Sequence, residues 1–371
     1  MAGKTSTVED ILMNNVLHEF YRNKKVLLTG HTGFKGSWLA FWLKTLGAHV
    51  TGVALEPEYE NSLFEKLSLS NIIDTHFQDI RDYAKLEAII SRTEPDIVFH
   101  LAAQALVRRS YEDPMLTFST NVMGSLNLLE SIRHCPSIRS LVYITSDKCY
   151  WNNEWTWGYR ESDSLGGPDP YSASKACAEH VFKSYFLSYF RERPNFGCAS
   201  TRAGNVIGGG DRAKDRIVPD IIRAIEKSTP IFLRNPQSTR PWQHVLDPLH
   251  GYLCLAMALY NNPSQLNGEA WNFGPSNQSI KMVYELAELL LDFWPETSIE
   301  TNTLNKNYHE SNLLHLSIDK AQSLLKWVPK YHFKHAVSQV GSWYKRVHDG
   351  EDPKQVTTEQ ITHFMECKET V

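Results

Sequence analysis

Short apolar runs alternate with amphipathic stretches from Lys24 onward, and this alternation constrains the fold more than any other feature. The runs are KVLLT (25–29), HVTGVAL (49–55), DIVFHLA (96–102) and LVYIT (141–145). Such continuous hydrophobicity is typical of strands buried on both faces of a parallel sheet. A helix-like segment follows each run, such as residues 37–47 or 115–134. The sequence therefore predicts an α/β fold with a doubly wound parallel sheet.

Composition excludes several classes of protein. The 371 residues allow about two domains at ~150 residues each, and the net charge of −4 argues against nucleic-acid binding, which needs a basic surface. No apolar run reaches the ~18 residues of a membrane span, and MAGKTSTVED has no signal-peptide pattern, so we expect a cytoplasmic protein. The six cysteines form no CxxC pair, and we expect no metal site.

A glycine-rich loop joins the first predicted strand to the first predicted helix. In LLTGHTGFKGSWLAFWL, the glycines are Gly30, Gly33 and Gly36. A dinucleotide site needs a tight turn, close backbone approach to a pyrophosphate and close helix packing, and the helix N-terminus offers free N–H groups. The context of strand, turn and helix favours a nucleotide site over a purely structural turn.

The end of the second predicted strand bears on the choice of cofactor. Glu56 follows this strand, and a carboxylate there can bind ribose hydroxyls and repel a 2′-phosphate, which favours NAD over NADP. Two alternatives stay open: Glu56 can be an ordinary solvated loop residue, and Lys35 in the glycine loop could tolerate a phosphate. Asp79 and Ile80, after a third expected strand, could meet the adenine edge.

PYSASKACAEHVF contains Tyr171 and Lys175 four residues apart. On a helix this spacing brings both side chains to one face, with Cβ atoms about 5–6 Å apart. A free tyrosine has a pKa of ~10, and a nearby ammonium and a positive nicotinamide ring both favour the phenolate. Such a tyrosine can take a proton from a sugar hydroxyl. The YxxxK pattern also occurs by chance, but behind a dinucleotide loop it favours catalysis.

The strand LVYIT runs directly into Ser146, Asp147 and Lys148. The carboxyl ends of strands in a doubly wound sheet face the ligand crevice, so these side chains are suited to chemistry. The alternative is an exposed turn with a local ion pair.

The pattern of strands and helices loosens after about residue 205. Helices are expected beyond it at 217–228, 248–261, 279–294 and 333–348. We expect a Rossmann-type dinucleotide-binding domain with the catalytic residues over 21–205. Residues 206–371 should form mainly a smaller α/β substrate-binding domain, with segments that return to the first domain. Residues 1–20 are an N-terminal extension without assigned function.

The motifs HTGFKG, HLAAQ, TNVMGS, TSDK, YSASK, RAGNVIGGGD and RPWQHV occur in this order along the chain. From about Phe20 to its end, the sequence resembles the extended short-chain dehydrogenase/reductase family, in the group of NDP-sugar 4,6-dehydratases that act on CDP-glucose. The cofactor contacts expected on this basis are Gly30, Thr32, Gly33, Phe34, Lys35, Gly36, Glu56, Asp79, Ile80, Leu101, Ala102, Ala103, Gln104, Asn121, Tyr171 and Lys175.

The resemblance implies NAD-dependent conversion of CDP-glucose to CDP-4-keto-6-deoxyglucose and water, in deoxysugar and surface-polysaccharide biosynthesis. The ring is oxidised at C4, water is eliminated across C5 and C6, and hydride returns to C6. Tyr171 would be the base for the 4-hydroxyl and Lys175 its electrostatic partner. Ser146 would orient this hydroxyl, and Asp147 would protonate the departing oxygen. Lys148 stands where related dTDP-glucose enzymes carry a glutamate base, so it is either the C5 base or a stabilising charge.

The substrate carries two phosphate charges that need local cations. Candidate substrate residues are Arg108, Asn205, Arg216, Arg234 and Arg240, each arginine having a surface charge as its alternative. His100, Gln104 and Arg108 would line the sugar or nicotinamide pocket, and WNNEWTWGYRESD (151–163) would form a flap near the sugar.

Two rival functions use the same motifs. A sugar-nucleotide epimerase or decarboxylase would share the Tyr–Lys pair but has no need of Asp147 beside Lys148. The second rival is a protein without catalytic activity that senses a dinucleotide and binds partners. Such a protein would have no need of Tyr171 and Lys175. The segments TNVMGSLNLLE and YSASKACAEHVFKSYFLSYF are apolar around much of their circumference, so we expect a homodimer or a dimer of dimers.

Overall fold

A seven-stranded sheet forms the centre of the chain in the computed structural model, which describes residues 16–301 and 313–367. All of its neighbouring strands are parallel, in the order β11-β6-β5-β4-β1-β2-β3. The strands are β1 (Lys25–Thr29), β2 (His49–Ala54), β3 (Asp74–Phe77), β4 (Ile97–His100), β5 (Ser140–Ile144), β6 (Gly197–Ala203) and β11 (Ala270–Phe273). The strand order reverses between β1 and β4, which is where doubly wound folds bind ligands.

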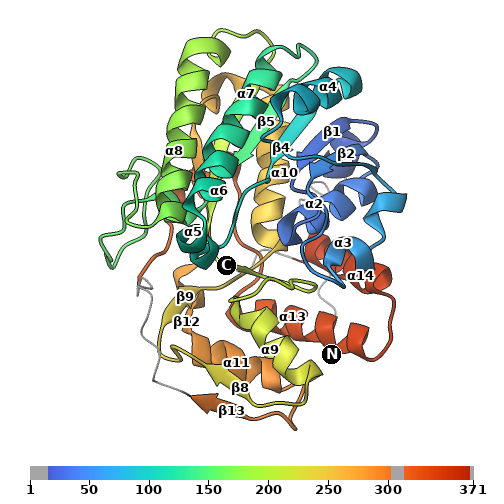
Figure 1. The fold of residues 1–371 in the computed structure, drawn as a ribbon, viewed down its shortest axis with the longest axis vertical. Helices are drawn as coiled ribbons and strands as arrows, with labels where there is room; N and C mark the ends of the chain where they lie inside the picture. The colour runs from blue at the N-terminus through green and yellow to red at the C-terminus, as the bar shows by residue number, and fades with distance from the viewer. Residues whose placement is uncertain (1–15, 302–312, 368–371) are drawn as a thin grey trace.

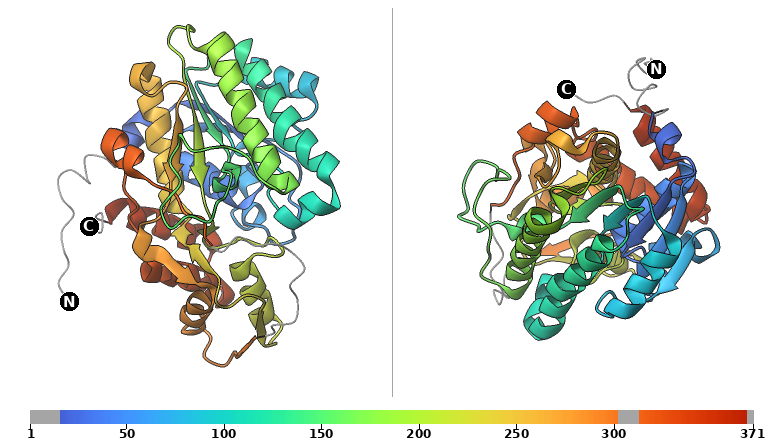
Figure 2. Two further views of the ribbon diagram at one scale, coloured as in Figure 1. Left: turned by 90° about the vertical axis from the view of Figure 1, so that its left-hand side faces the viewer. Right: turned by 90° about the horizontal axis from the view of Figure 1, so that it is seen from above.

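Helices cover both faces of this sheet (Figures 1 and 2). One face carries α2 (Phe34–Thr45), α10 (Leu246–Asn261) and α14 (Pro353–Glu366), and the other carries α4 (Tyr83–Thr93), α7 (Ser125–Arg133) and α8 (Pro170–Tyr185). Successive strand residues serve opposite faces, so Leu27 lies in one core cluster and Leu28 in the other. The predicted doubly wound sheet is confirmed.

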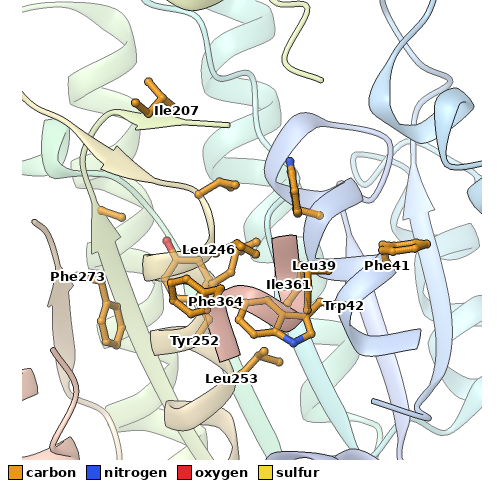
Figure 3. Close-up of a cluster of buried hydrophobic side chains, with 14 of the residues drawn as sticks. Leu39, Phe41, Trp42, Ile207, Leu246, Tyr252, Leu253, Phe273, Ile361 and Phe364 are labelled. Atoms are coloured by element: carbon orange, nitrogen blue, oxygen red, sulfur yellow. The ribbon is translucent and has the colours of Figure 1, made fainter. Parts of the chain in front are cut away.

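Helices α2, α10 and α14 meet in the larger core cluster (Figure 3). The indole of Trp42 on α2 packs edge-on against the ring of Phe364 on α14, with centroids 5.8 Å apart. Burying one such side chain contributes about 1.5–3 kcal/mol. The C-terminal helix therefore belongs to the Rossmann layer, as does β11.

A second, smaller group of elements lies below the sheet in Figure 1. Its helices are α9 (Ile217–Glu226), α11 (Val283–Leu291) and α13 (Phe333–His348). Its strand pairs are β8 (Ile231–Leu233) with β13 (Ile299–Thr301), and β9 (Thr239–Pro241) with β12 (Ile280–Met282). A third pair, β7 (Val206–Ile207) with β10 (Gln243–His244), leads into it. Further helices are α3 (Leu63–Lys66), α5 (Val107–Glu112), α6 (Pro114–Phe118) and α12 (Asp319–Leu325).

Two predicted helices differ from the structure. The helix expected at 279–294 begins only at Val283, because Ile280–Met282 pairs with β9 instead. The stretch 115–134 is divided into α6, a π-helix η2 (Ser119–Gly124) and α7. A π-helix inside a helical run often marks a functional position.

Part of the predicted N-terminal extension belongs to the core. Residues 16–21 are helical, Leu17 is buried, and the Tyr21 hydroxyl donates to the carbonyl of Leu253 on α10 at 2.8 Å. Residues 1–15 lie outside the described residues. Within the described ranges, no helix combines the length and the apolar character needed to cross a membrane.

Candidate active site

The glycine loop between β1 and α2 has no room for side chains at two of its positions. Gly30 has φ +78°, and a Cβ there would lie 2.7 Å from the backbone nitrogen of Ala102. A Cβ on Gly36 would lie 2.0 Å from the carbonyl oxygen of Gly30. Helix α2 begins directly after Gly33, so its first N–H groups face the end of β1. This geometry fits the pyrophosphate of a dinucleotide.

The expected ribose and adenine contacts follow β2 and β3. The Thr32 hydroxyl donates to the carbonyl of Leu55 at 2.9 Å, which ties the glycine loop to the end of β2, and the next residue, Glu56, is exposed. The carboxylate of Asp79 is paired with Arg81 at 2.6 Å, and the side chain of Ile80 is buried in the core. Contacts from these last two residues to a cofactor would therefore come from their backbone.

A buried hydrogen-bond network holds the loop after β4, which contains Leu101, Ala102, Ala103 and Gln104. The amide side chain of Asn121, in the π-helix, accepts from the Gln104 backbone at 2.8 Å and donates to the Ser174 hydroxyl on α8 at 2.9 Å. The Gln104 side chain donates to Thr117 and to the carbonyl of Leu106. Asn121 and Gln104 thus position the loop.

His100, expected to line the pocket, is buried between elements of the Rossmann layer. Its ring nitrogens bond the hydroxyls of Thr29 on β1, at 2.7 Å, and Ser125 on α7, at 2.9 Å. Burial lowers its pKa to about 3, so the ring is neutral near pH 7. His100 therefore joins β1, β4 and α7 in the interior.

Tyr171 and Lys175 lie in the first turns of α8, which Asp169 caps by accepting from the backbone N–H of Ser172 at 2.9 Å. Their residues are only 7% and 6% exposed. Burial raises the pKa of Tyr171 to about 12, although a hydrogen bond with Ser146 lowers it. Burial also lowers the pKa of Lys175 to about 8. In the protein alone, desolvation dominates the pKa of Tyr171, and the expectation that a nearby ammonium and a positive nicotinamide ring together favour the phenolate stays a prediction.

Ser146, Asp147 and Lys148 follow β5 directly, as expected. The Ser146 hydroxyl donates to the carboxylate of Asp147 at 2.9 Å and accepts from the backbone N–H of Lys148 at 3.2 Å. Asp147 is buried, and burial raises its pKa against the opposing pull of Lys148 and Ser146. Burial therefore favours the protonated form of Asp147 more than an exposed position would.

A small cleft opens beside these residues, lined by Asp147, Lys148, Asn205, Arg240, Pro241 and Leu314. Two sequence candidates for substrate binding, Asn205 and Arg240, are thus brought to the catalytic cluster. Lys35 from the glycine loop is also near: burial lowers its pKa to about 8, while the charge of Asp147 raises it. The glycine loop, the Ser146–Lys148 turn and the second, smaller group of elements (called the second lobe below) come together here.

The other three arginine candidates pair with acidic side chains. Arg216 contacts Asp211 at 3.0 Å, and its charge also lowers the pKa of Tyr171. Arg108 and Arg234 share the carboxylate of Asp215, at 2.7 and 3.0 Å. The guanidinium groups of Arg108 and Arg234 thus gather around one aspartate that joins α5 to the second lobe.

Sequence reasoning missed a buried ion pair behind the catalytic residues. Glu179, on α8, binds the guanidinium of Arg202, on β6, through both carboxylate oxygens and also accepts from Thr145 and Ser200. Glu179 lies four residues after Lys175, so the helical period was a signal that could have revealed it.

The polar and aromatic segment 151–163 is anchored to this ion pair. Arg202 donates to the Tyr150 hydroxyl at 2.7 Å and to the carbonyl of Glu161 at 3.0 Å. The Tyr159 ring stacks on Tyr150 and Trp155, while the side chain of Trp157 is exposed. The expected flap therefore has a fixed base and an exposed tip.

The fold and site together define an enzyme of the Rossmann type with a Tyr–Lys pair at its dinucleotide crevice. The sequence model of the family described as GDP-mannose 4,6 dehydratase matches residues 27–340. The chain belongs to this family.

Known proteins support the assignment. The chain is 45% identical over 350 residues to a CDP-glucose 4,6-dehydratase of Salmonella typhimurium, covering 93% of this chain and 97% of the relative. It is 27% identical to a CDP-paratose 2-epimerase of Salmonella typhi, covering 86% and 98%.

Solved structures confirm the fold. The epimerase Mth375 of Methanothermobacter thermautotrophicus superposes with a TM-score of 0.77 at 23% identity, covering 91% of this chain and 96% of that one. A double mutant of DesIV, the dTDP-glucose 4,6-dehydratase of Streptomyces venezuelae, with NAD and DAU bound, gives 0.73 at 21% identity, covering 89% and 99%.

Proposed function

We propose that the chain converts CDP-glucose to CDP-4-keto-6-deoxyglucose and water, with NAD as a cofactor that ends each cycle unchanged. The observation that carries this proposal is the 45% identity to a CDP-glucose 4,6-dehydratase along nearly the full length of both chains. The buried acid Asp147 beside Lys148, next to the Tyr171–Lys175 pair, supports it, because an epimerase needs no acid for a leaving oxygen. The product would supply deoxysugar biosynthesis.

The glycine loop would hold the cofactor's pyrophosphate, and Glu56 the adenosine ribose. The DesIV structure was solved with NAD, which supports the same cofactor here. NAD, when bound, supplies the hydride acceptor for C4 and the hydride donor for C6. Residues 21–205 would carry the cofactor and catalytic groups, and 206–371 mainly the nucleotide, with β11 and α14 returning to the Rossmann layer.

Tyr171 would take the proton of the 4-hydroxyl. With a pKa of about 12 in the protein alone, it needs cationic help at neutral pH. Lys175, on the same helix face, and Arg216 would supply positive charge, and Ser146 would orient the hydroxyl. A neutral tyrosine would thus become a base when cofactor and substrate complete the site.

Elimination across C5 and C6 would use the next two residues. Asp147 would give its proton to the departing 6-oxygen, since burial raises its pKa and favours the protonated form. Lys148 is half-buried and lines the same cleft. It would take the C5 proton when neutral, and its alternative role is to stabilise the enolate oxygen as a cation.

The substrate phosphates would exchange for the carboxylates that now hold the arginines. Guanidinium groups match phosphate oxygens with two parallel hydrogen bonds. Arg240 and Asn205 line the cleft, and Arg216, Arg108 and Arg234 lie toward the second lobe. These five would bind the diphosphate.

The direct test is incubation with CDP-, dTDP-, GDP- and UDP-glucose, following the alkali-induced absorbance of 4-keto-6-deoxy products. We expect turnover with CDP-glucose at catalytic amounts of NAD. NADH accumulating in step with product would contradict a dehydratase, and an isomeric sugar without loss of water would identify an epimerase.

The role of Lys148 can be separated from its charge. Lys148→Met should still allow oxidation at C4 but block exchange of the C5 hydrogen with solvent deuterium. Lys148→Arg retains a cation that cannot act as a base. If the arginine variant restores exchange, the charge was the contribution; if neither variant exchanges, Lys148 is the base.

We also propose a dimer formed through the helices that hold residues 120–130 and 171–190, which are η2, α7, α8 and the π-helix η4 (Phe186–Phe190), together with the adjoining α5 and α6. The continuous run of α6, η2 and α7 lies beside α8 (Figure 1). Exposed apolar side chains of these elements are Tyr111, Met115, Phe118, Met123, Leu187 and Tyr189. Such a surface fits a second copy of the chain, because isologous contacts bury the same apolar patch twice.

Light scattering tests this interface. The native chain should be a dimer, or a tetramer of two dimers, at micromolar concentration. Met115→Glu should yield monomers that keep the native circular dichroism spectrum, while Leu324→Glu, an exposed apolar residue on α12, should leave the mass unchanged. A native monomer would refute the proposal.

A further inference from the structure

Two histidines and a cysteine converge at the contact between α13 and α14, away from the candidate active site. His335 lies near the start of α13, while His363 and Cys367 lie at the end of α14. One ring nitrogen of each histidine and the cysteine Sγ all lie within 4.8 Å of one another. Nothing in the proposed dehydration uses these side chains.

We propose that His335, His363 and Cys367 bind a transition-metal ion, with Zn²⁺ as the best-fitting one. Imidazole and thiolate together suit zinc, whereas magnesium and calcium prefer oxygen. Three protein ligands leave the fourth tetrahedral position to water, which makes an open and exchangeable site.

The spacing of the ligand atoms matches tetrahedral zinc. The Sγ of Cys367 lies 3.5 Å from Nδ1 and 3.7 Å from Nε2 of His363. Zn–N bonds of about 2.0–2.1 Å and a Zn–S bond of about 2.3 Å require N and S to be about 3.5 Å apart. His363 and Cys367 stand four residues apart, so the helix itself sets this distance. His363 and Cys367 could thus bind a metal with little movement, and His335, within 4.8 Å, would close onto it.

Neighbouring side chains contact the histidine rings and orient them. The Tyr331 hydroxyl lies 2.9 Å from Nδ1 of His363, and this contact leaves Nε2 for the metal. The Tyr331 ring also stacks on His335, with centroids 4.3 Å apart, and Gln339 bonds Nε2 of His335 at 3.2 Å. The imidazoles are therefore held before any ion arrives.

A cation lies close to the cysteine. The ammonium of Lys330 donates to the carbonyls of Phe364 and Met365, just before Cys367, at 3.2 and 3.3 Å. These contacts hold the last turn of α14, which Cys367 follows directly, against Lys330. The absence of CxxC pairs had led us to expect no metal, but the structure brings a third ligand from a different helix.

Cobalt(II) is the probe for the site, because a thiolate ligand gives it a charge-transfer absorption. The full-length protein, freed of any affinity tag and treated with a chelator and reductant, should bind one equivalent of Co²⁺ with this absorption. Zn²⁺ should displace the cobalt and raise the unfolding temperature. Cys367→Ser should lose the absorption and weaken Zn²⁺ binding at least tenfold, and His335→Gln should weaken it similarly.

Matched controls exclude incidental binding. Cys177→Ser changes an exposed cysteine on α8, and His348→Gln changes an exposed histidine on α13; neither should alter the titration. Failure to bind one equivalent, or an unchanged spectrum in Cys367→Ser, would overturn the proposal. Because the readout is metal binding and not turnover, its failure would leave the proposed dehydratase activity untouched.

Discussion

The ion pairs on the two sides of the candidate active site differ in burial. On the catalytic side, the side chains of Arg202 and Glu179 are 4% and 3% exposed and hydrogen-bond each other through two N–H groups and both carboxylate oxygens, behind Lys175. On the substrate side, Arg108 and Arg234 share Asp215, whose side chain is 44% exposed. The buried pair fixes positions, while the exposed pairs can exchange partners.

This difference has an energetic reason. Breaking a buried ion pair leaves an uncompensated charge in the interior and costs about 3–5 kcal/mol. An exposed pair is worth about 0–1 kcal/mol. If Arg108 and Arg234 bind the substrate as proposed, phosphate would displace Asp215 at small cost, whereas no ligand would readily rearrange Arg202. The proposed substrate contacts would then adapt, while the buried pair behind Lys175 stays fixed.

The largest effect is expected at the catalytic base. Tyr171→Phe keeps the ring but removes the oxygen that accepts the proton, so turnover should fall about 10²–10⁴-fold. Substrate binding by calorimetry and the circular dichroism spectrum should stay near native. A variant with more than a few per cent of native activity would show that the base is another group.

The buried pair should dominate stability. Glu179→Gln leaves Arg202 without its counter-charge and should lower the free energy of unfolding by about 3–5 kcal/mol in urea titrations. The matched control is Asp349→Asn in the exposed Lys345–Asp349 pair, which should cost less than about 1 kcal/mol. If both variants lost the same free energy of unfolding, the buried pair would be no more important for stability than an exposed one.

On the substrate side, Arg240→Lys keeps the charge but loses the planar fork that grips phosphate. Loss of a charge-assisted hydrogen bond costs about 1.5–3 kcal/mol, so KM should rise about 10- to 100-fold with a smaller change in kcat. Arg346→Lys, on a salt bridge of α13 far from the cleft, is the control. A fall in kcat without a rise in KM would show that Arg240 acts in catalysis and not in substrate binding.

A further effect concerns acid stability, and it is small just below neutral pH. Burial lowers the pKa of His100 to about 3, whereas an unfolded histidine titrates near 6.5. Below pH 6.5 the unfolded state binds the proton and the folded state does not, so stability is lost as pH falls toward 3. His100→Gln should flatten this slope by up to about 1.4 kcal/mol per pH unit. His49→Gln, on the exposed start of β2, should leave the slope unchanged.

Local spacing let the sequence predict much of this protein. Apolar runs predicted β1, β2, β4 and β5 to within two residues, and the helix expected at 333–348 is α13. The glycine loop and the Tyr171–Lys175 pair were recognisable because turns and helical periods depend on neighbours in the chain. The boundary at 279–294 was not, because a partner strand, β9, takes Ile280–Met282 out of the helix.

Only the tertiary structure decided how the charges act. The pKa of Tyr171 depends on burial by segments distant in the chain. The sequence identifies this tyrosine but does not show which groups surround it. Arg202 pairs with Glu179 and Arg234 pairs with Asp215, although neither partner is a neighbour in sequence. His335 and Cys367 likewise come together from different helices. Spacing along the chain determines which side chains share a helix face, whereas desolvation and pairing depend on contacts that exist only after the sheet and its helices have packed.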